Sequence, residues 1–213
     1  MNIAAILQEK YTICADLAEL IAQKARIKIL PKSAYISFQD SQVEQVILPL
    51  KGVLAFSPTN ADYAGITYNL ITPGMIVNDT PYLLSTPSIA EIRATTECTF
   101  LSLTFEETDA LIAAYPQFLK TLSRSVAQKQ YVFHTLFHLR AEKNADLKVR
   151  RALAVLADVM EDRIVRLNIL SLASLLGMSR NRVGASIKSM IANGEVIKVK
   201  GGYEIVTSLA LAA

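Results

Sequence analysis

The spacing of apolar residues changes twice along the chain and divides it into three parts. Apolar residues recur at helical intervals in residues 2–25 and again from Pro116 onward. Between Ile27 and Thr104 they form short runs rich in β-branched and aromatic residues, separated by turn residues. The pattern therefore predicts one or two leading helices, a region of short strands and a helical C-terminal part.

The middle part contains roughly eight short apolar runs, each bounded by Pro, Gly, Asn, Asp or Ser. Short strands at such intervals are typical of an antiparallel sandwich or a jelly-roll barrel. After the last run, a helix is expected to begin within Thr104–Glu107, with Thr104 or Thr108 as its cap. The predicted strands are 28–30, 34–38, 44–49, 53–57, 65–71, 74–77, 89–94 and 99–104.

One long helix is predicted from Pro116 to about Ala141, because Pro116 suits a first helical turn and an apolar stripe follows it. The stripe extends over about 30 Å of helix, more than a small barrel needs as cover. An exposed apolar seam of this length predicts a parallel homodimer, with Lys129 and Gln130 as a polar interruption. Packing on the chain's own barrel alone is the alternative. The predicted dimer-interface residues are Leu119, Leu122, Val126, Phe133, Leu136 and Phe137.

The C-terminal part predicts a helix-turn-helix. Residues 145–163 should form a helix capped by Asn144, after a polar boundary at residues 140–144. Further on, Gly177 can end one helix in the left-handed conformation and Ser179 can cap the next. The residues of this second helix expected to face a core are Val183, Ile187, Met190 and Ile191.

Two β-rich runs, at residues 195–200 and 203–207, follow the second helix and flank Gly201-Gly202. A Gly-Gly loop suits a primed hairpin turn, because both positions can take positive φ. The segment from Asn168 to Val206 thus predicts a winged helix-turn-helix, which sets a recognition helix in the DNA major groove. The predicted fold class is α+β, with a jelly-roll sensor-like domain at 1–115, a dimerisation helix at 116–141 and a winged helix-turn-helix at 142–213.

Charge is distributed unevenly between these parts. Residues 1–139 hold 10 Lys and Arg against 12 Asp and Glu, whereas residues 140–213 hold 12 against 7. Within Ser179–Lys200 there are five basic residues and one acid, Glu195. An isolated charge run usually marks a solvated helix face, but on a helix-turn-helix it favours binding to nucleic acid phosphates.

Composition excludes several other classes of protein. No apolar run approaches the roughly 18 residues of a membrane span, and the N-terminus lacks the pattern of a secretion signal. The chain has only two cysteines, Cys14 and Cys98, so a disulfide framework is not expected. Residence in the cytoplasm, without a membrane partner, is therefore the expectation.

The order of barrel, long helix and winged helix-turn-helix resembles the Crp/Fnr family of bacterial transcription regulators. The most specific part is LASLLGMSRNRVGASIKSMIANGEV, at Leu172–Val196, which is similar to that family's helix-turn-helix pattern. Leu48–Phe56 and Asn69–Val77 resemble the family's barrel strands and the turn before its ligand cassette. The resemblance implies a homodimer that binds a pseudo-palindromic operator in double-stranded DNA, with RNA polymerase as a further candidate partner.

The ligand cassette departs from the family pattern. Cyclic-nucleotide binders of the family carry an arginine that pairs with the cyclic phosphate, and Ser88 stands at that position. Glu91 follows closely, and Pro81 lacks a backbone donor that such a turn would offer. Burying a phosphate beside a carboxylate without a cation is unfavourable. The sequence therefore argues against a cyclic nucleotide.

No other cofactor is identifiable from the sequence. The family's iron–sulfur regulators use four cysteines, and haem needs an axial ligand. The only histidines are His134 and His138, at i and i+4 on the long helix. That spacing can share a metal but is more often a helix face, so no metal site is predicted. The roles of Cys14 and Cys98 are left open, with redox sensing as one alternative to inert thiols.

Arg180 is the best candidate for a base contact, because its fork matches guanine O6 and N7. Asn181 can read adenine or bridge through water, while the small Gly184 and Ala185 allow a close approach to the bases. Family members often have a glutamate at the position of Asn181 and an arginine at that of Ala185, so the familiar half-site is not assumed. The predicted phosphate contacts are Asn168, Ser179, Arg182, Lys188, Lys198 and Lys200.

The sequence therefore predicts a DNA-binding transcription regulator that does not respond to cyclic AMP. The alternative is a regulatory module that binds an effector or a protein and whose winged helix contacts a protein partner. An enzyme of the cupin type is disfavoured, because residues 27–104 contain no histidine. No grouping of a nucleophile with a histidine base is evident either.

Overall fold

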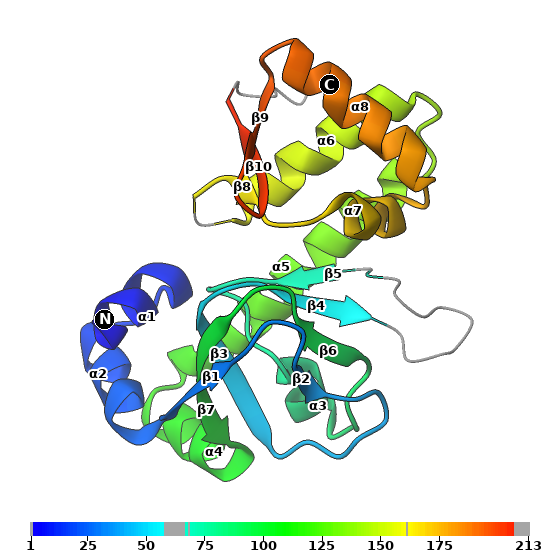
Figure 1. Ribbon diagram of the computed structural model, residues 1–213. Helices are drawn as coiled ribbons and strands as arrows, with labels where there is room; N and C mark the ends of the chain where they lie inside the picture. Colours follow the sequence, from blue (N-terminus) through cyan, green and yellow to red (C-terminus); the bar gives the residue numbers. More distant parts are fainter. Residues whose placement is uncertain (1, 58–66, 68, 161, 207–213) are drawn as a thin grey trace. The chain divides into compact units, whose positions relative to one another are not determined.

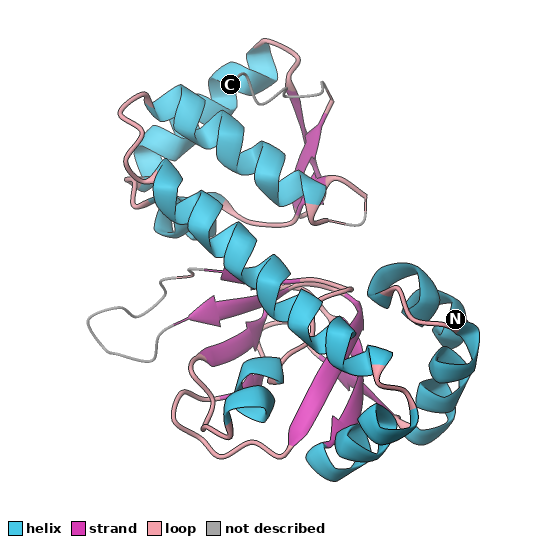
Figure 2. Ribbon diagram, turned by 180° about the vertical axis from the view of Figure 1, so that it is seen from behind, coloured by secondary structure: helices cyan, strands magenta, loops and turns pink. Residues whose placement is uncertain are grey.

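The computed structural model describes residues 2–57, 67, 69–160 and 162–206 (Figures 1 and 2). The chain combines helices and sheets in two compact units, of which the first comprises residues 1–61 and 70–130 and the second residues 62–69 and 131–213. The division falls inside the long helix α5 (Gln117–Leu139), which is continuous in Figure 2. The sequence pattern placed the boundary later, at residues 140–144. The last turns of α5 belong to the second unit, because the residue that follows α5 is hydrogen-bonded to other helices of that unit, as described below.

The described strands that precede α5 form two sheets, with strand orders β1-β7-β3 and β2-β6-β4-β5. The pairs β1–β7, β3–β7, β2–β6 and β4–β6 are antiparallel, as the sequence pattern predicted. The strands are β1 (Arg26–Leu30), β2 (Tyr35–Ser37), β3 (Gln45–Lys51), β4 (Leu54–Ser57), β5 (Asn69–Ile71), β6 (Glu91–Ala94) and β7 (Cys98–Thr104).

The structure differs from the predicted strands in two places. The run 74–77 makes only an isolated bridge, Ile47 with Val77, instead of a strand. It is followed by a short helix, α3 (Asp79–Leu84), which the sequence pattern did not predict. Of the predicted strand 65–71, residues 69–71 form β5, and the part at 65, 66 and 68 lies outside the described residues.

The core of the first unit lies between the helices and the β1-β7-β3 sheet. Five consecutive residues of β3, Val46–Leu50, are buried, so both faces of this strand are covered. Leu48 and Leu101 lie opposite each other in the sheet, and Leu7, Leu17 and Phe118 belong to the same apolar cluster. The helices of this unit that contribute to the cluster are α1 (Ile3–Tyr11), α2 (Ala15–Lys24), α4 (Phe105–Ala114) and the first part of α5.

The start of α4 confirms Thr104, rather than Thr108, as the cap, and the two residues Thr104 and Glu107 form a capping box. The Glu107 N–H donates to Thr104 Oγ1 at 3.0 Å, and the Thr104 N–H donates to Glu107 Oε2 at 2.7 Å. Two otherwise unpaired donors of the first turn are thereby satisfied by residues three positions apart.

The second unit has the winged helix-turn-helix arrangement (Figure 1). Asn144 caps its first helix as predicted, but that helix ends at Asp158 rather than at Arg163. A two-residue strand at 164–165 follows and joins the hairpin as its outer strand, in the order β8-β10-β9. The elements are α6 (Ala145–Asp158), β8 (Ile164–Val165), α7 (Ile169–Leu176), α8 (Arg180–Ala192), β9 (Val196–Val199) and β10 (Gly202–Ile205).

The hairpin turn differs from the predicted Gly-Gly loop. Val199 pairs with Gly202, so the two loop residues are Lys200 and Gly201. Of these only Gly201 has positive φ, at 84°, and the turn is therefore not a primed one. Gly202 is a strand residue, and a Cβ there would lie 2.5 Å from the Val165 carbonyl oxygen. Gly202 thus permits the close packing of β10 against β8.

Candidate DNA-binding interface and sensor pocket

The turn between α7 and α8 is fixed by hydrogen bonds that the sequence predicted. Gly177 ends α7 with φ 61°, and the Met178 N–H donates to the Ala173 carbonyl at 2.9 Å. Ser179 then caps α8, since its Oγ accepts from the Arg182 N–H at 3.3 Å. At the other end of α7, Asn168 Oδ1 accepts from the Ser171 N–H at 2.8 Å.

One face of α8 packs against the rest of the second unit, and the other face is exposed. Val183, Ile187 and Met190 are buried as predicted, whereas Ile191 is 38% exposed and lies outside the core. Ile191 is rotated about 100° around the helix axis from Met190, which takes it to the edge of the buried face. The fourth buried position is Ser186, whose hydroxyl donates to Asp146 Oδ1 of α6 at 2.5 Å.

The predicted DNA-contacting residues lie on the accessible surface of this unit. Asn168, Ser179, Asn181 and Ala185 are exposed, and Gly184 is half-buried. A Cβ at Gly184 would lie 3.7 Å from Ile169 Cδ1, which is an ordinary contact distance. The basic residues Arg180, Arg182, Lys188, Lys198 and Lys200 are all exposed too.

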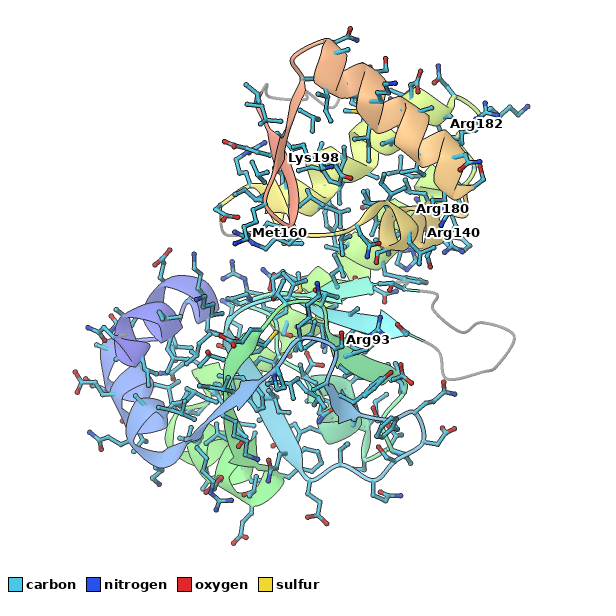
Figure 3. The ribbon with its side chains drawn as sticks, in the orientation of Figure 1. Arg93, Arg140, Met160, Arg180, Arg182 and Lys198 are labelled. Atoms are coloured by element: carbon cyan, nitrogen blue, oxygen red, sulfur yellow. The ribbon has the colours of Figure 1, made fainter. Side chains whose placement is uncertain are left out.

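These five exposed cations differ from the basic residues of the unit that are held in ion pairs. Arg163 and Arg166 pair with Asp158 and Asp162, but within the described part of the chain no carboxylate pairs with any of the five. Figure 3 shows Arg180 and Arg182 at the N-terminal end of α8 and Lys198 on the hairpin. The end of the recognition helix and the hairpin therefore present positive charge that acidic side chains of the chain do not neutralise.

The hairpin is anchored by a bidentate ion pair. Arg150 of α6 donates from Nε to Glu195 Oε2 at 2.7 Å and from Nη2 to Oε1 at 2.8 Å. The bonded guanidinium lowers the pKa of the Glu195 carboxyl, and the pKa of Arg150 is raised in turn. Glu195 directly precedes β9, so the pair fixes the base of the hairpin to α6.

Helix α5 has two apolar faces, and this corrects the predicted dimer stripe. Leu122 and Leu136 are 0% and 2% exposed within the single chain, so they belong to its own core and not to an exposed seam. Leu119 and Phe137 are 43% and 55% exposed. The sequence pattern merged both faces into one stripe. The predicted residues that lie on the outward face are Leu119, Val126, Phe133 and Phe137.

Lys129 is not the predicted polar interruption of a dimer seam. It is buried and pairs with Asp79 at the start of α3. Its Nζ also donates to the Ile76 carbonyl at 2.7 Å, while Ser125 Oγ donates to Asp79 Oδ2 at 2.6 Å. Burial lowers the pKa of the Lys129 ammonium, and the Asp79 carboxylate opposes that shift.

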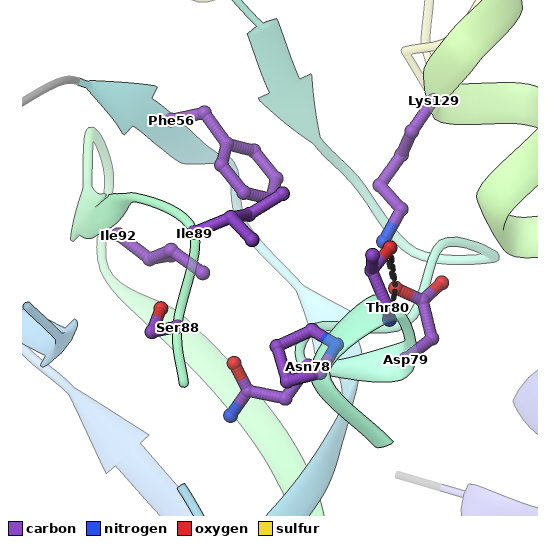
Figure 4. A pocket seen from close by; sticks show the side chains of 9 residues that line it. Phe56, Asn78, Asp79, Thr80, Ser88, Ile89, Ile92 and Lys129 are labelled. Atoms are coloured by element: carbon purple, nitrogen blue, oxygen red, sulfur yellow. Dashed lines mark hydrogen bonds and ion pairs between the residues drawn. The ribbon is translucent and has the colours of Figure 1, made fainter. Parts of the chain in front are cut away.

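A small pocket surrounds this ion pair (Figure 4). Its cavity volume is about 10 Å³, close to the space that a single water molecule needs. Lys129 is the only cation among its lining residues and extends toward Asp79 in Figure 4. The buried Asn78 donates to the Gln45 carbonyl, and its Oδ1 has no partner among the residues that the structure describes. The lining residues are Phe56, Asn78, Asp79, Thr80, Pro81, Ser88, Ile89, Ile92 and Lys129.

The acid in this pocket is Asp79 and not Glu91. Glu91 is half-buried on β6, whereas its neighbours Ala90 and Ile92 are buried, and only Ile92 of the three lines the pocket. Ser88 occupies the position of the family's phosphate arginine, and its hydroxyl donates to the Ala90 carbonyl at 2.9 Å. Among the residues that line the pocket, the one cation, Lys129, is already paired with Asp79.

The histidines and cysteines lie apart from the pocket lining. His134 and His138 are exposed on α5, with ring centroids 6.0 Å apart. Among the described residues no group of three or more His, Cys, Asp or Glu is arranged to hold a metal ion. Cys14 is exposed, whereas Cys98 is buried and burial raises the pKa of its thiol.

Sequence reasoning missed the Asp79–Lys129 pair and the hydrogen bonds of Arg140, which are described below. The spacing of Ser125 and Lys129, one helical turn apart beside buried residues of α5, is a sequence signal for the Asp79–Lys129 pair. No local pattern marks the hydrogen bonds of Arg140.

Among the described helices, none is long and apolar enough to cross a membrane.

Two sheets, a long helix and a winged helix-turn-helix give the chain the fold of Crp/Fnr transcription regulators, which confirms the resemblance seen in its sequence. The structure of CLP, a c-di-GMP-responsive global regulator of Xanthomonas campestris, superposes with a TM-score of 0.70 at 15% identity, covering 91% of this chain and 100% of that one. FixK2 from Bradyrhizobium japonicum gives a TM-score of 0.71 at 15% identity, with 86% and 93% covered.

One curated protein supports the same class. The HTH-type transcriptional regulator Cmr of Mycobacterium tuberculosis (strain CDC 1551 / Oshkosh) is 24% identical over 173 residues. The match covers 81% of this chain and 69% of Cmr. No family model matches the chain.

Proposed function

We propose that this protein is a sequence-specific DNA-binding transcription regulator that places α8 in the major groove. The observation that carries the proposal is the set of five exposed cations on α8 and the hairpin, which have no carboxylate partner among the described residues. Lys and Arg in such positions neutralise phosphates and release counterions. Arg180, at the start of α8, has a guanidinium group that can donate two hydrogen bonds to O6 and N7 of a guanine. The likeness to Cmr, a named transcriptional regulator, supports the same function.

We further propose that the regulator acts as a parallel homodimer. The outward face of α5 carries Leu119, Val126, Phe133 and Phe137, with intervals of seven, seven and four residues. This is the periodicity of a coiled-coil seam. Two recognition helices related by a two-fold axis read an inverted repeat whose half-sites lie about 34 Å apart. RNA polymerase is the further partner that we propose for the DNA-bound dimer.

The pocket supports regulation without a cyclic nucleotide. A cyclic phosphate there would have to displace Asp79 from Lys129 and leave a buried carboxylate without its cation. Ser88 adds a hydroxyl that is already bonded to the Ala90 carbonyl. The residues that line the pocket therefore offer no unpaired cation to compensate a bound phosphate.

The decisive experiment is selection of bound sequences from random double-stranded DNA with the purified full-length protein. We expect enrichment of an inverted repeat and a binding constant that falls steeply with salt concentration. Recovery of no motif, together with salt-independent behaviour in a gel-shift assay, would contradict DNA recognition. That result would favour the alternative in which the winged helix contacts a protein.

A further inference from the structure

Arg140 is the first residue after α5, and it joins that helix to the helix-turn-helix. Its guanidinium donates from Nε to the Leu175 carbonyl at 3.1 Å and from Nη2 to the Ser174 carbonyl at 3.2 Å. These carbonyls are in the last turn of α7, where the helix dipole favours a cation. The Ser174 carbonyl also accepts from the Gly177 N–H at 3.2 Å, so Arg140 adds a second donor there. The Arg140 side chain therefore serves as a C-terminal cap that comes from outside α7.

The main chain of Arg140 is fixed as well. Its carbonyl oxygen accepts from Lys148 Nζ of α6 at 2.9 Å, and Lys148 is 8% exposed. A Cβ on Gly177 would lie 3.9 Å from Arg140 Cδ and Nε, so the side chain lies beside the residue that turns the chain into α8. Arg140 thus links the end of α5 to α6 through its backbone and to the α7–α8 turn through its side chain.

We propose that Arg140 is a positioning residue, which fixes the recognition helix to the end of α5 and so sets the half-site spacing that the dimer accepts. This inference rests on the proposed function. In a dimer joined along α5, the C-terminal ends of the two α5 helices are held at a fixed separation. The position of each recognition helix then depends on how it is attached to the end of its own α5. One base pair of added spacer moves a half-site by about 3.4 Å and rotates it by about 35° around the DNA axis. A rigid link therefore rejects altered spacers, and a loosened link tolerates them.

A lysine cannot replace this arginine fully. The two carbonyls are bonded by two donors of one planar group, which an ammonium on a flexible stem does not match. Arg140→Lys keeps the charge and removes the fork, while Arg140→Ala removes both. Arg163→Ala is the matched control, because Arg163 is an arginine of the same unit whose guanidinium pairs with Asp158.

The experiment measures affinities of the full-length protein for the best inverted repeat and for versions with the spacer changed by one and two base pairs. We expect a sharp optimum for the wild type and the Arg163→Ala variant. In Arg140→Ala the ratio of affinities between optimal and altered spacers should fall by about fivefold or more, the usual scale of coupling between sites. Arg140→Lys should give an intermediate ratio, and affinity for a single half-site should remain within about twofold of wild type.

Three results would overturn the inference or its basis, and they differ from one another. An unchanged spacing optimum in Arg140→Ala refutes the role of Arg140 alone. A uniform loss on every DNA, with the salt slope lowered by about one, would instead make Arg140 a phosphate contact. A wild-type protein without any spacing optimum would contradict the proposed function. If Arg140→Ala proves unfolded by thermal melting, the Arg140→Lys variant decides, because an unchanged ratio there refutes the role.

Discussion

At the scale of single residues, the first unit depends on a buried ion pair. Asp79 accepts from Lys129, from Ser125 Oγ and from the Thr80 N–H, so its carboxylate is well satisfied despite 1% side-chain exposure. A pair of this kind adds little over a well-packed apolar pair, but each partner depends strongly on the other. We therefore expect substitutions at the two residues to have non-additive effects on stability.

Removing one partner of this pair should destabilise the first unit strongly. Lys129→Met and Asp79→Leu each leave a buried charge unpaired, and we expect each to cost about 3–5 kcal/mol of unfolding free energy. The double variant should lose clearly less than the sum, which urea unfolding of all three variants measures. Lys120→Met, at an exposed position of the same helix, is the control. Additive losses would show that the two side chains do not interact.

Two cations of the second unit should affect DNA binding differently. Arg180→Ala is expected to cost about 1–3 kcal/mol and to relax preference at one base pair, since its fork is assigned to a guanine edge. Lys198→Ala should weaken binding to all sequences alike and lower the salt slope by about one. Competition binding against single-base variants of the selected site distinguishes them. Equal effects of both substitutions on every sequence would contradict the base contact.

The ion pair at the base of the hairpin predicts a pH-dependent stability. Because Arg150 lowers the pKa of Glu195 in the folded state, the stabilisation is present above the ordinary glutamate pKa and is lost as pH falls through the lowered value. We expect Glu195→Gln to cost about 0.5–1 kcal/mol at pH 7, since the pair is partly exposed. Denaturant unfolding at pH 7 and at successively lower pH should show this difference shrinking. A difference that grows in acid would reverse the assignment.

At the scale of elements, α5 is organised by two faces that serve different purposes. Phe118, Leu122 and Leu136 pack inward, and the exposed Leu119 and Phe137 mark a second face about 90° away. An apolar face left exposed along a helix of 23 residues is unusual for a monomer. This face is the physical basis for expecting a dimer.

Charge on the outward face should dissociate the proposed dimer. Val126→Glu combined with Phe137→Glu places carboxylates in the seam, and sedimentation or light scattering should then report a monomer with weakened DNA binding. Tyr131→Glu is the control, because Tyr131 is 67% exposed on the opposite side of α5 from the seam. Unaltered dimerisation in the double variant would place the interface elsewhere.

At the scale of the whole molecule, we propose that the protein is a regulator whose sensing chemistry differs from that of cyclic-nucleotide binders. We expect calorimetry to detect no binding of cyclic AMP or cyclic GMP, and neither nucleotide to change DNA affinity. The reason is that the pocket's cation is already neutralised by Asp79. Micromolar binding of either nucleotide would refute this, and Lys129→Met would then test whether Lys129 holds the phosphate.

The sequence predicted the features that depend on neighbouring residues. Helical and strand periodicity, a cap at Thr104 or Thr108 and the caps at Asn144 and Ser179 were all evident, because each signal lies within about one turn of chain. The exposed recognition face of α8 followed from the same spacing. The hairpin at Gly201-Gly202 shows the limit, since two glycines allow either register and only packing against β8 selects one.

Tertiary structure alone decided which residues far apart in the sequence meet. Lys129 and Asp79 are 50 positions apart and Arg140 and Leu175 are 35 apart, so no local periodicity relates them. The inward and outward faces of α5 are likewise distinguished by what packs on them, because both are apolar. The sequence by itself thus determined the kinds of elements and the exposed basic surface that we propose binds DNA. The fold determined the pocket at Asp79 and Lys129, the division of α5 into two faces and the link at Arg140, because these depend on contacts that form only when distant segments pack.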